Sequence, residues 1–495
     1  MTEQLPFHVR VGAGARVAAD RLGTCAIPGR RTPRRSSCRS PIGWKEEKTM
    51  GERDITRAVA SAIEPLKDGT GRWDRLLALI GDARLVLLGE ASHGTHEFYA
   101  ARAGITQRLI TEKGFDAVAV EADWPDSLRA SRYAQGGSDD ADANAALGGF
   151  QRFPRWMWRN TEVAAFIEWL RQVNSSRGAD ERVGFFGLDL YSLRASMDAV
   201  VRYLETVDPE AAKRARARYA CFDHIAEDPQ RYGYATTFGL VEHCEREVLR
   251  QLAELTGDPE RYLHHDGIAA ADELFYAQQN ARVAANAEAY YRSMFAGRHE
   301  SWNRRDSHMA ETLENLLGHL DSSRGRPAKI AVWAHNSHLG DARRTEMGEA
   351  GEHNLGQLVR QRFGAEHARL IGFTTHAGTV TAASDWDSPA ELKRVRDSHP
   401  ESFERVFHDI GVERFLLASD RVPALRRERR LERAIGVIYL PGSERVSHYF
   451  YADIAKQFDA VIHFDRTRAL TPLDPSTMWK HSESPEQMET YPSGM

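Results

Sequence analysis

Apolar runs of strand length alternate with amphipathic stretches of helical length along most of the chain. The runs lie at residues 84–88, 115–120, 183–188, 329–333, 370–374, 435–439 and 460–464. Short, apolar runs of this kind predict buried β-strands, and the last two are expected to complete the sheet. Strands that alternate with helices are typical of α/β proteins. We therefore expect an α/β fold with a mostly parallel central sheet flanked by helices.

One long stretch without strand signals interrupts this alternation. From Leu193 to Leu320 the chain has a helical period and is rich in Ala, Arg, Glu and Leu. We expect a helical subdomain, residues 193–325, inserted between two parts of the α/β core, residues 51–192 and 326–473. The tail, residues 474–495, is expected to be loosely ordered.

Residues 1–50 differ in composition from the rest of the chain. Their stretch 30–39 is basic, contains Ser and Pro and has no hydrophobic period, so we expect a disordered leader. The favoured interpretation is a mis-assigned start, with synthesis beginning at Met50. A nucleic-acid-binding or targeting arm is the alternative.

Composition and charge exclude several classes of protein. The chain has 495 residues and a formal net charge of -5, which favours neither nucleic acid nor an anionic membrane as a partner. No apolar stretch approaches the roughly 20 residues that a membrane helix needs. None of the four cysteines forms a CxxC pair, and Cys25 and Cys38 lie in the leader. We therefore expect no disulfide framework and a reducing, cytoplasmic location.

Polar residues with acid–base or ligand chemistry follow most of the predicted strands. The segment Gly-Glu-Ala-Ser-His-Gly-Thr-His-Glu-Phe, residues 89–98, directly follows the first of them. The later strands are followed by Glu121 and Asp123, by Asp189, by His335 and His338, and by His376. Because the carboxyl ends of parallel strands meet at one edge of a sheet, these side chains are expected to converge. The sequence thus predicts an active site at this edge.

Arg102 is expected on the buried face of the helix that follows the first motif. Thr95 can cap this helix, which should end at Gly114 and whose inner stripe is Phe98, Arg102, Ile105 and Leu109. An isolated buried charge is costly, so Arg102 needs an anionic partner and becomes a site candidate. The alternative is an arginine that snorkels past the apolar face into water.

The sequence lacks the motifs of a side-chain nucleophile. It has no GxSxG around a serine, no HExxH pair, no Walker loop and no cysteine near the predicted edge. Activation of water by a general base is one chemistry that remains. His93 would take the proton, and Glu90 or Glu121 would orient its ring and stabilise the imidazolium.

In the same mechanism His335 or His338, with Arg102 nearby, would stabilise the oxyanion of the attacked carbonyl. A metal-activated water is the second chemistry. His93, His335, His338 and Glu121 could hold zinc or iron, although their spacing matches no familiar ligand signature. A binding module for a small metabolite or antibiotic, with the same geometry but no turnover, is a third possibility.

Three further segments allow both a structural and a functional role. His96 and Glu97 fall at the start of a helix, where Glu97 complements the helix dipole, so the structural role is favoured. The aromatic and basic stretch 150–158 could line a pocket for a large ligand or pack between subdomains. Arg305 and Asp306 are expected on a solvated helix face in preference to a network facing the cleft.

The segments 89–98, 121–123, 333–338, 447–450 and 458–463 together resemble the erythromycin esterase family. The similarity runs from about Asp54 to Leu473 and covers most of the chain. It implies an α/β core with a largely helical second part around a wide cleft. It also implies a metal-independent hydrolase that opens the lactone ring of macrolide antibiotics with histidine-activated water, which in some members confers resistance.

At the matching positions the resemblance makes His93 the base and Glu90 its partner, with the site completed by Arg102, Glu121, His335 and His338. The implied partner is a small-molecule ester or lactone, and no cofactor is implied. More distant relatives of this fold include haem- or iron-binding proteins, which keeps the metal alternative open. We expect the opening of an ester or lactone; the residues do not identify erythromycin itself as the natural substrate.

Overall fold

The central strands of the sheet are buried on both faces, as parallel strands covered by helices must be. The computed structural model describes residues 51–69, 71–223, 229–263, 268–295 and 297–480. Within these residues the main sheet has nine strands in the order β1-β8-β11-β6-β2-β5-β3-β4, with β7 paired to β6. The strands are β1 (Glu64–Pro65), β2 (Leu85–Leu88), β3 (Ala117–Asp123), β4 (Gly184–Asp189), β5 (Ile330–Trp333), β6 (Ala368–Ala382), β7 (Glu391–Val395), β8 (Arg414–Ala418) and β11 (Ala460–Thr467).

The consecutive strands from β11 to β4 are all parallel to their neighbours. The antiparallel strands β1, β7 and β8 lie outside this run. The predicted α/β class with a mostly parallel sheet is therefore confirmed. A separate antiparallel pair is formed by β9 (Arg430–Arg433) and β10 (Tyr449–Ala452).

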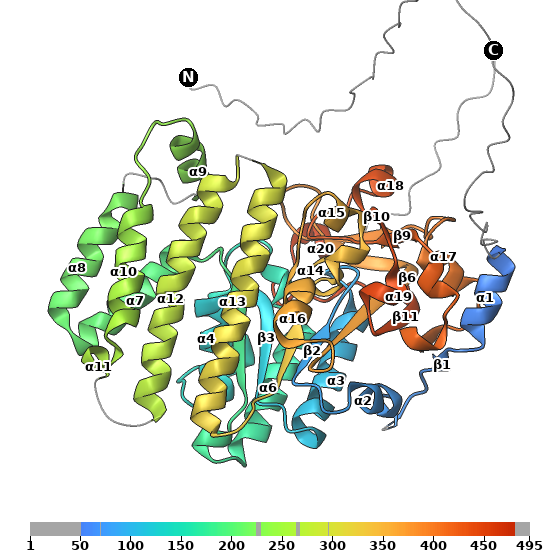
Figure 1. Ribbon diagram of the computed structural model, residues 1–495, viewed down its shortest axis with the longest axis horizontal. Helices are drawn as coiled ribbons and strands as arrows, with labels where there is room; N and C mark the ends of the chain where they lie inside the picture. Colours follow the sequence, from blue (N-terminus) through green and yellow to red (C-terminus); the bar gives the residue numbers. More distant parts are fainter. Residues whose placement is uncertain (1–50, 70, 224–228, 264–267, 296, 481–495) are drawn as a thin grey trace, which may run out of the picture. The chain divides into compact units, whose positions relative to one another are not determined.

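Successive side chains of each strand enter two hydrophobic cores on opposite faces of the sheet. On β2, Val86 and Leu88 join one core, whereas Leu85 and Leu87 join the other. Figure 1 shows the helices around the sheet. The first core is covered by α2 (Asp74–Ile80), α3 (His96–Glu112) and α6 (Thr161–Ser175), and the second by α1 (Glu52–Ala60), α13 (Arg298–Arg324), α16 (Leu355–Phe363) and α17 (Phe403–His408).

The helices between β4 and α13 have a third core of their own, rich in Ala, Leu and Tyr. They are α7 (Leu193–Val207), α8 (Pro209–Tyr219), α9 (Pro229–Thr237), α10 (Glu245–Gly257), α11 (Pro259–Tyr262) and α12 (Ile268–Ser293). In Figure 1 α7, α8, α10 and α12 lie side by side, in agreement with their mutual contacts. Helix α13 ends the helical stretch and packs on the sheet as well, and the division into a separate subdomain stays a prediction.

The remaining helices are short, apart from α4, which follows β3 and packs against β4. They are α4 (Trp124–Ala134), α5 (Ala143–Ala146), α14 (Asn336–Leu339), α15 (Glu346–Glu349), α18 (Glu444–Ser447), α19 (Ile454–Gln457) and α20 (Thr477–Lys480). No helix in the described part of the chain is both long and apolar enough to cross a membrane. The predicted leader, residues 1–50, lies outside the described residues.

One prediction about the end of the chain is wrong, and the prediction of a loosely ordered tail can be compared with the structure only up to residue 480. Residues 435–439 form no strand, because their backbone instead makes single bridges to Ser92 and Ala383. The amide of Ile435 donates to the Ala91 carbonyl, so this segment holds the loop after β2. The part of the tail up to residue 480 is packed, since the Trp479 indole N–H donates to Thr381 Oγ1 at 2.8 Å. Residues 481–495 lie outside the described residues.

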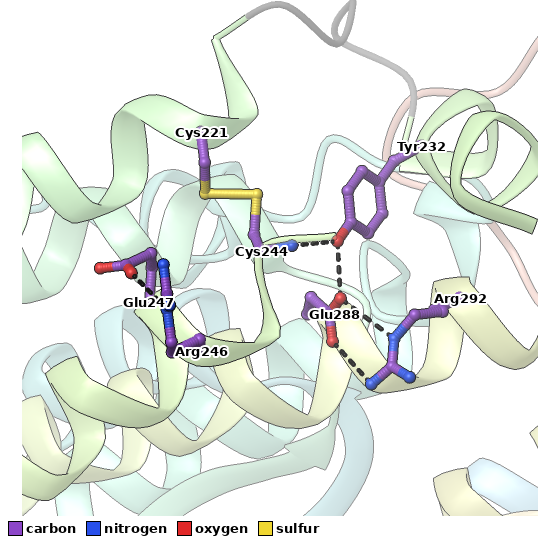
Figure 2. The surroundings of a disulfide bond; sticks show 7 residues. All are labelled: Cys221, Tyr232, Cys244, Arg246, Glu247, Glu288 and Arg292. Carbon is purple, nitrogen blue, oxygen red and sulfur yellow. Dashed lines mark hydrogen bonds and ion pairs between the residues drawn. A yellow bond between two sulfur atoms is a disulfide. The ribbon is translucent and has the colours of Figure 1, made fainter. Parts of the chain in front are cut away.

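The expectation that the cysteines form no disulfide framework is corrected by one bond. Cys221 and Cys244 are joined, with Cα atoms 6.0 Å apart and a sequence separation of 23 (Figure 2). Helix α9 lies between the two cysteines in sequence. Its Tyr232 hydroxyl accepts the Cys244 N–H and donates to Glu288. Sequence spacing alone does not reveal that the chain brings Cys244 next to Cys221. Since disulfides are rare in a reducing cytoplasm, the cytoplasmic location stays a prediction.

The disulfide predicts a measurable contribution to stability. Peptide mapping of the unreduced protein is expected to yield the Cys221 and Cys244 peptides cross-linked. The double change Cys221→Ser and Cys244→Ser is expected to lower the free energy of unfolding by about 2–4 kcal/mol, because the closed loop restricts the unfolded chain. A denaturant titration measures this, with Cys25→Ser and Cys38→Ser as the control. Four free thiols in the untreated protein would contradict the bond.

Gly94 predicts a second stability effect, in the loop after β2. A Cβ atom at this position would lie 1.8 Å from the Thr381 carbonyl oxygen, since the loop packs backbone to backbone. Thr381 also donates its N–H to the Gly94 carbonyl at 3.0 Å. Gly94→Ala is therefore expected to lower the free energy of unfolding by about 1–3 kcal/mol, measured by denaturant titration.

Gly318 provides the matched control for this change. It is exposed within α13, and a Cβ atom there would meet nothing within 4 Å. Gly318→Ala is expected to raise the free energy of unfolding by roughly 0.5–1 kcal/mol, because alanine favours a helix interior. Equal stabilities of the two variants would show that the loop is not tightly packed.

Candidate active site

The carboxyl ends of four neighbouring strands bring the predicted polar residues together. Glu90 follows β2, Glu121 lies in the last part of β3, Asp189 ends β4 and His335 follows β5. These strands are adjacent in the order β2-β5-β3-β4. The predicted convergence at one sheet edge is therefore found for all of these residues.

His93 is held by a buried carboxylate. Its Nδ1 lies 3.0 Å from Glu90 Oε1, and both side chains are buried. A carboxylate only accepts hydrogen bonds, so the Nδ1 proton is donated to Glu90 and Nε2 keeps its lone pair. The His93 ring lies beside that of His335, with ring centroids 4.8 Å apart.

Arg102 is the second partner of the Glu90 carboxylate. Its Nη2 lies 2.9 Å from Glu90 Oε2, and the side chain is fully buried on the inner face of α3. The contact is an ion pair by distance and lacks hydrogen-bond alignment. The guanidinium also lies over the Tyr99 ring, 4.2 Å from its centroid. The need of Arg102 for a buried anion was predicted correctly, and snorkelling into water is ruled out.

The expectation that Arg102 lies beside the oxyanion is wrong. Arg102 lies behind Glu90 and does not line the cavity in front of His93. The reason is its place on the inner stripe of α3, which packs against the sheet. Arg102 can therefore act on the chemistry only through Glu90.

Glu121 connects three segments of the chain. Its Oε2 accepts the backbone N–H of His335 at 2.9 Å, and its Oε1 accepts from Arg305 Nη2 at 2.6 Å. Burial opposes its charge, but His338 and Arg305 outweigh that effect and hold the Glu121 pKa well below its usual value. Glu121 is thus a buried, ionised carboxylate that positions the segment after β5.

Arg305 and Asp306 belong to the site, which corrects the expectation of a solvated helix face. Arg305 donates to both oxygens of Asp189, at 3.0 and 2.7 Å, as well as to Glu121. Asp306 is completely buried and accepts the Leu355 N–H at 2.8 Å. The signal in the sequence was the adjacent cation and anion on a helix, together with unpaired carboxylates at the ends of β3 and β4.

His338 lies between two carboxylates. Its Nδ1 is 2.9 Å from both oxygens of Asp306, and its Nε2 is 3.3 Å from Glu121 Oε1. Trp302 stacks on the ring, with centroids 4.5 Å apart. Burial opposes the charged ring, but Asp306 and Glu121 outweigh it and raise the His338 pKa to about 9. His338 is therefore a cation at neutral pH.

His335 has the opposite character. Burial, followed by the neighbouring His93, holds its pKa well below the usual value, so the ring is neutral. The Ser337 backbone N–H donates to Nδ1 at 3.2 Å, which places the ring proton on Nε2. Nε2 is buried and has no hydrogen-bond partner among the described residues. The Ala91 backbone carbonyl interacts with the ring and raises its pKa without meeting hydrogen-bond geometry, so Nε2–H is a weakly engaged donor at the wall of the cavity.

A cavity of about 590 Å³ opens in front of these histidines. His93, Glu121, His335, His338 and Arg305 belong to its polar lining, which also includes Asp123, Asp126, Arg152, Asp189, His299, Ser337, Glu346, Glu352, Ser447 and His448. Its apolar wall comes from other segments and includes Phe150, Phe153, Met157, Trp158, Tyr191, Trp302, Trp386, Val437 and Phe450. A volume of this size is typical of sites for small organic ligands.

The other candidate residues take different places. His376 lies inside β6, stacked on His408, and does not line this cavity. His96 pairs with Glu162 at 2.6 Å and Glu97 with Arg468 at 3.0 Å, in agreement with the favoured structural role. Within stretch 150–158, Trp158 lines the cavity and also packs on Phe185 in the first core, whereas packing between subdomains stays a prediction.

The metal alternative was tested on the same side chains. In the described part of the chain, no group of three or more His, Cys, Asp or Glu side chains is arranged to hold a metal ion. Both ring nitrogens of His338 face charged side chains, which leaves neither free as a ligand. The set His93, His335, His338 and Glu121 is thus close together but committed to other contacts.

Comparison with known proteins identifies the family of this chain. The family model described as erythromycin esterase matches residues 110–467. The chain belongs to the erythromycin esterase family. The match begins after Glu90, His93 and Arg102, so the part that these residues take in the site rests on the geometry above.

Curated relatives extend the similarity over most of the chain. Erythromycin esterase type II of Escherichia coli is 23% identical over 420 residues, which are 79% of this chain and 91% of that protein. Erythromycin esterase type I of Escherichia coli is 22% identical over 361 residues, 67% of this chain and 80% of that protein. As a member of this family, the protein is an erythromycin esterase-family hydrolase.

Solved structures support the fold. A Bacillus cereus protein has a TM-score of 0.72 at 18% identity, covering 86% of this chain and 100% of its own. A mutant of the erythromycin esterase EreC in its open conformation has a TM-score of 0.61 at 18% identity, covering 84% of this chain and 97% of its own. These structural similarities support the α/β architecture. At such low sequence identity they do not identify the substrate.

The raised pKa of His338 predicts a pH-dependent stability. Because its native pKa of about 9 exceeds the unfolded value near 6.5, the charged ring stabilises the protein below pH 6.5. This contribution, roughly 3 kcal/mol, is lost as the pH rises through 9. Asp306→Asn is expected to lower the His338 pKa, measured by NMR of labelled imidazoles, and to flatten the loss of stability. Glu314→Gln, on the exposed side of α13, should change neither, and an unchanged pKa in Asp306→Asn would contradict the assignment.

Proposed function

We propose that this protein hydrolyses an ester or lactone of a small organic molecule with water activated by His93. The observation that carries the proposal is the buried array Arg102, Glu90 and His93, which ends at the same cavity as His335, whose Nε2–H makes no well-aligned hydrogen bond among the described residues. A base and an oxyanion donor beside each other are what acyl transfer to water requires. Membership of the erythromycin esterase family supports the same reaction.

The base in this mechanism is His93 Nε2. It removes a proton from water as the oxygen attacks the carbonyl carbon, and the ring becomes positively charged. Glu90 accepts the Nδ1 proton throughout and stabilises the imidazolium. Arg102 provides the positive charge that a buried carboxylate needs beside it and holds Glu90 in place behind His93.

The oxyanion forms beside His335 in this proposal. The neutral ring donates its Nε2–H to the carbonyl oxygen as that oxygen gains negative charge. The tetrahedral intermediate then collapses, the C–O bond to the leaving alcohol breaks, and the alkoxide takes the proton from the His93 imidazolium. The products are a carboxylic acid and an alcohol, which stay in one molecule when the substrate is a lactone.

Macrolides are the first substrates to test. The two Escherichia coli relatives are named erythromycin esterases, and the cavity has an apolar, aromatic wall of the kind that a large lactone would contact. Antibiotic resistance and the absence of a metal requirement belong to this proposal as well. The wall is built from side chains outside the polar set, so it can select a different ester without a change in the chemistry.

The decisive variant is His93→Asn. It is expected to lower kcat by at least about a hundredfold while the substrate still binds, because only the base is removed. The measurement is mass-spectrometric detection of the gain of one water by a panel of macrolides, simpler lactones and esters, with a chelator present. Glu90→Gln is expected to lower kcat as well, and His408→Asn, outside the cavity, to leave it unchanged.

Each other outcome points to a different function. Activity of the wild type that disappears with chelator and returns with zinc or iron would replace the general base by a metal. Saturable binding of a lactone without turnover, in wild type and His93→Asn alike, would make the protein a binding module. Full activity in His93→Asn would contradict the assignment of the base.

A further inference from the structure

A second hollow in the protein is lined almost entirely by cations. Its volume is about 380 Å³, and it shares no lining residue with the cavity at His93. The lining consists of Asp341, Arg343, Arg344, Arg360, Ala365, Arg426 and Lys456. Such a concentration of positive charge is unusual in a chain with a net charge of -5.

Four segments that are distant in sequence build this hollow. Arg343 and Arg344 lie in the turn Ala342–Arg344, which follows α14, and Arg360 lies in α16. Arg426 lies in the turn Leu425–Arg427, and Lys456 lies in α19. The cations are thus brought together by tertiary structure and do not come from one basic run of the sequence.

A buried carboxylate orients two of the guanidinium groups. Asp341 is 2% exposed and accepts from Arg343 Nε at 2.8 Å and from Arg343 Nη2 at 2.7 Å. Arg360 Nη1 lies 3.8 Å from the same carboxylate, and its Nη2 donates to Asp459 at 2.6 Å. The Arg360 Nε is buried and has no hydrogen-bond partner within the described residues. This anchoring separates the hollow from an ordinary solvated patch of arginines.

Two of the positive charges have no counterpart. Lys456 is paired with Asp453 at 3.0 Å, and the pairs of Arg343 and Arg360 are those given above. No ion pair or hydrogen bond is made by the Arg344 or Arg426 guanidinium to any described residue. The hollow therefore has an unneutralised charge of about two, which a dianion would balance.

We infer that this hollow is a binding site for a small anion that carries phosphate groups. Arginine forks match the oxygens of a phosphate group with paired, charge-assisted hydrogen bonds. The only apolar lining residue is Ala365, and no aromatic side chain lines the hollow. It therefore offers no platform for a nucleobase, and the ligand is a compact phosphate or pyrophosphate group without a base. This inference does not depend on the proposed hydrolysis.

The test is isothermal titration calorimetry of the full chain with inorganic pyrophosphate at low salt. We expect saturable binding to one site, weakened by salt. The double change Arg344→Gln and Arg426→Gln is expected to weaken it by about tenfold or more, because charge-assisted hydrogen bonds are lost. Both side chains are exposed and unpaired, so thermal unfolding of the variant should match that of the wild type.

The matched control is the double change Arg53→Gln and Arg421→Gln. It removes the same charge from two exposed arginines outside the hollow, and binding should stay within about twofold of the wild type. Equal weakening by the control, or no saturable binding of pyrophosphate, would overturn the site. Citrate that binds as tightly as pyrophosphate would overturn the phosphate class. Much tighter binding of ADP would overturn the exclusion of a base.

Discussion

The buried carboxylate of Glu121 is the interaction on which the site depends. It is 3% exposed and contacts the His335 amide, Arg305 and His338, which come from two other segments. A buried carboxylate is stable only when cations and hydrogen-bond donors surround it, so α13 must lie against the carboxyl edge of the sheet. The helical stretch between β4 and β5 therefore helps to build the candidate site, because its last helix neutralises the strand ends.

Two buried histidines of the same segment have opposite charge states, one set by carboxylates and the other by burial. His338, between Asp306 and Glu121, is a cation at neutral pH, whereas His335, whose Nδ1 accepts a backbone N–H, is neutral. The neutral ring can donate to a developing oxyanion without bringing a fixed charge next to the base. In the proposed mechanism, a cation at position 335 would repel the positive charge that His93 gains, since the two rings are 4.8 Å apart. The fixed positive charge thus lies on His338, whereas His335, whose ring lies beside His93, is neutral.

The sequence predicted the sheet and the convergence of its polar ends because both follow from short apolar runs and from the direction of parallel strands. It also predicted a buried anion for Arg102, since a cation on an inner helical stripe has to be neutralised. It did not place Arg305 and Asp306, because charged residues on a helix have the same pattern whether they face water or buried carboxylates. The run 435–439 has the composition of a strand, but its backbone partners, Ser92 and Ala383, are defined only by the folded loops. The pairing of Cys221 with Cys244 likewise depends on how the fold places α9 and the segment after it.

The polar residues at the sheet edge and the apolar residues of the cavity wall lie in different parts of the fold. This division determines which properties can be inferred from similarity to known proteins. The polar set lies on strand ends and on α13, whose positions are dictated by buried charges and backbone pairing, and the fold that carries them is shared with a solved structure at 18% identity. The wall at Phe150, Trp158, Trp386 and Val437 comes from connecting segments, where substitutions leave the sheet intact. Because binding of the non-reacting part of a substrate sets specificity while the polar set performs the reaction, the two can diverge separately. The fold and the strand ends therefore support a reaction class, and the substrate has to be determined from the wall.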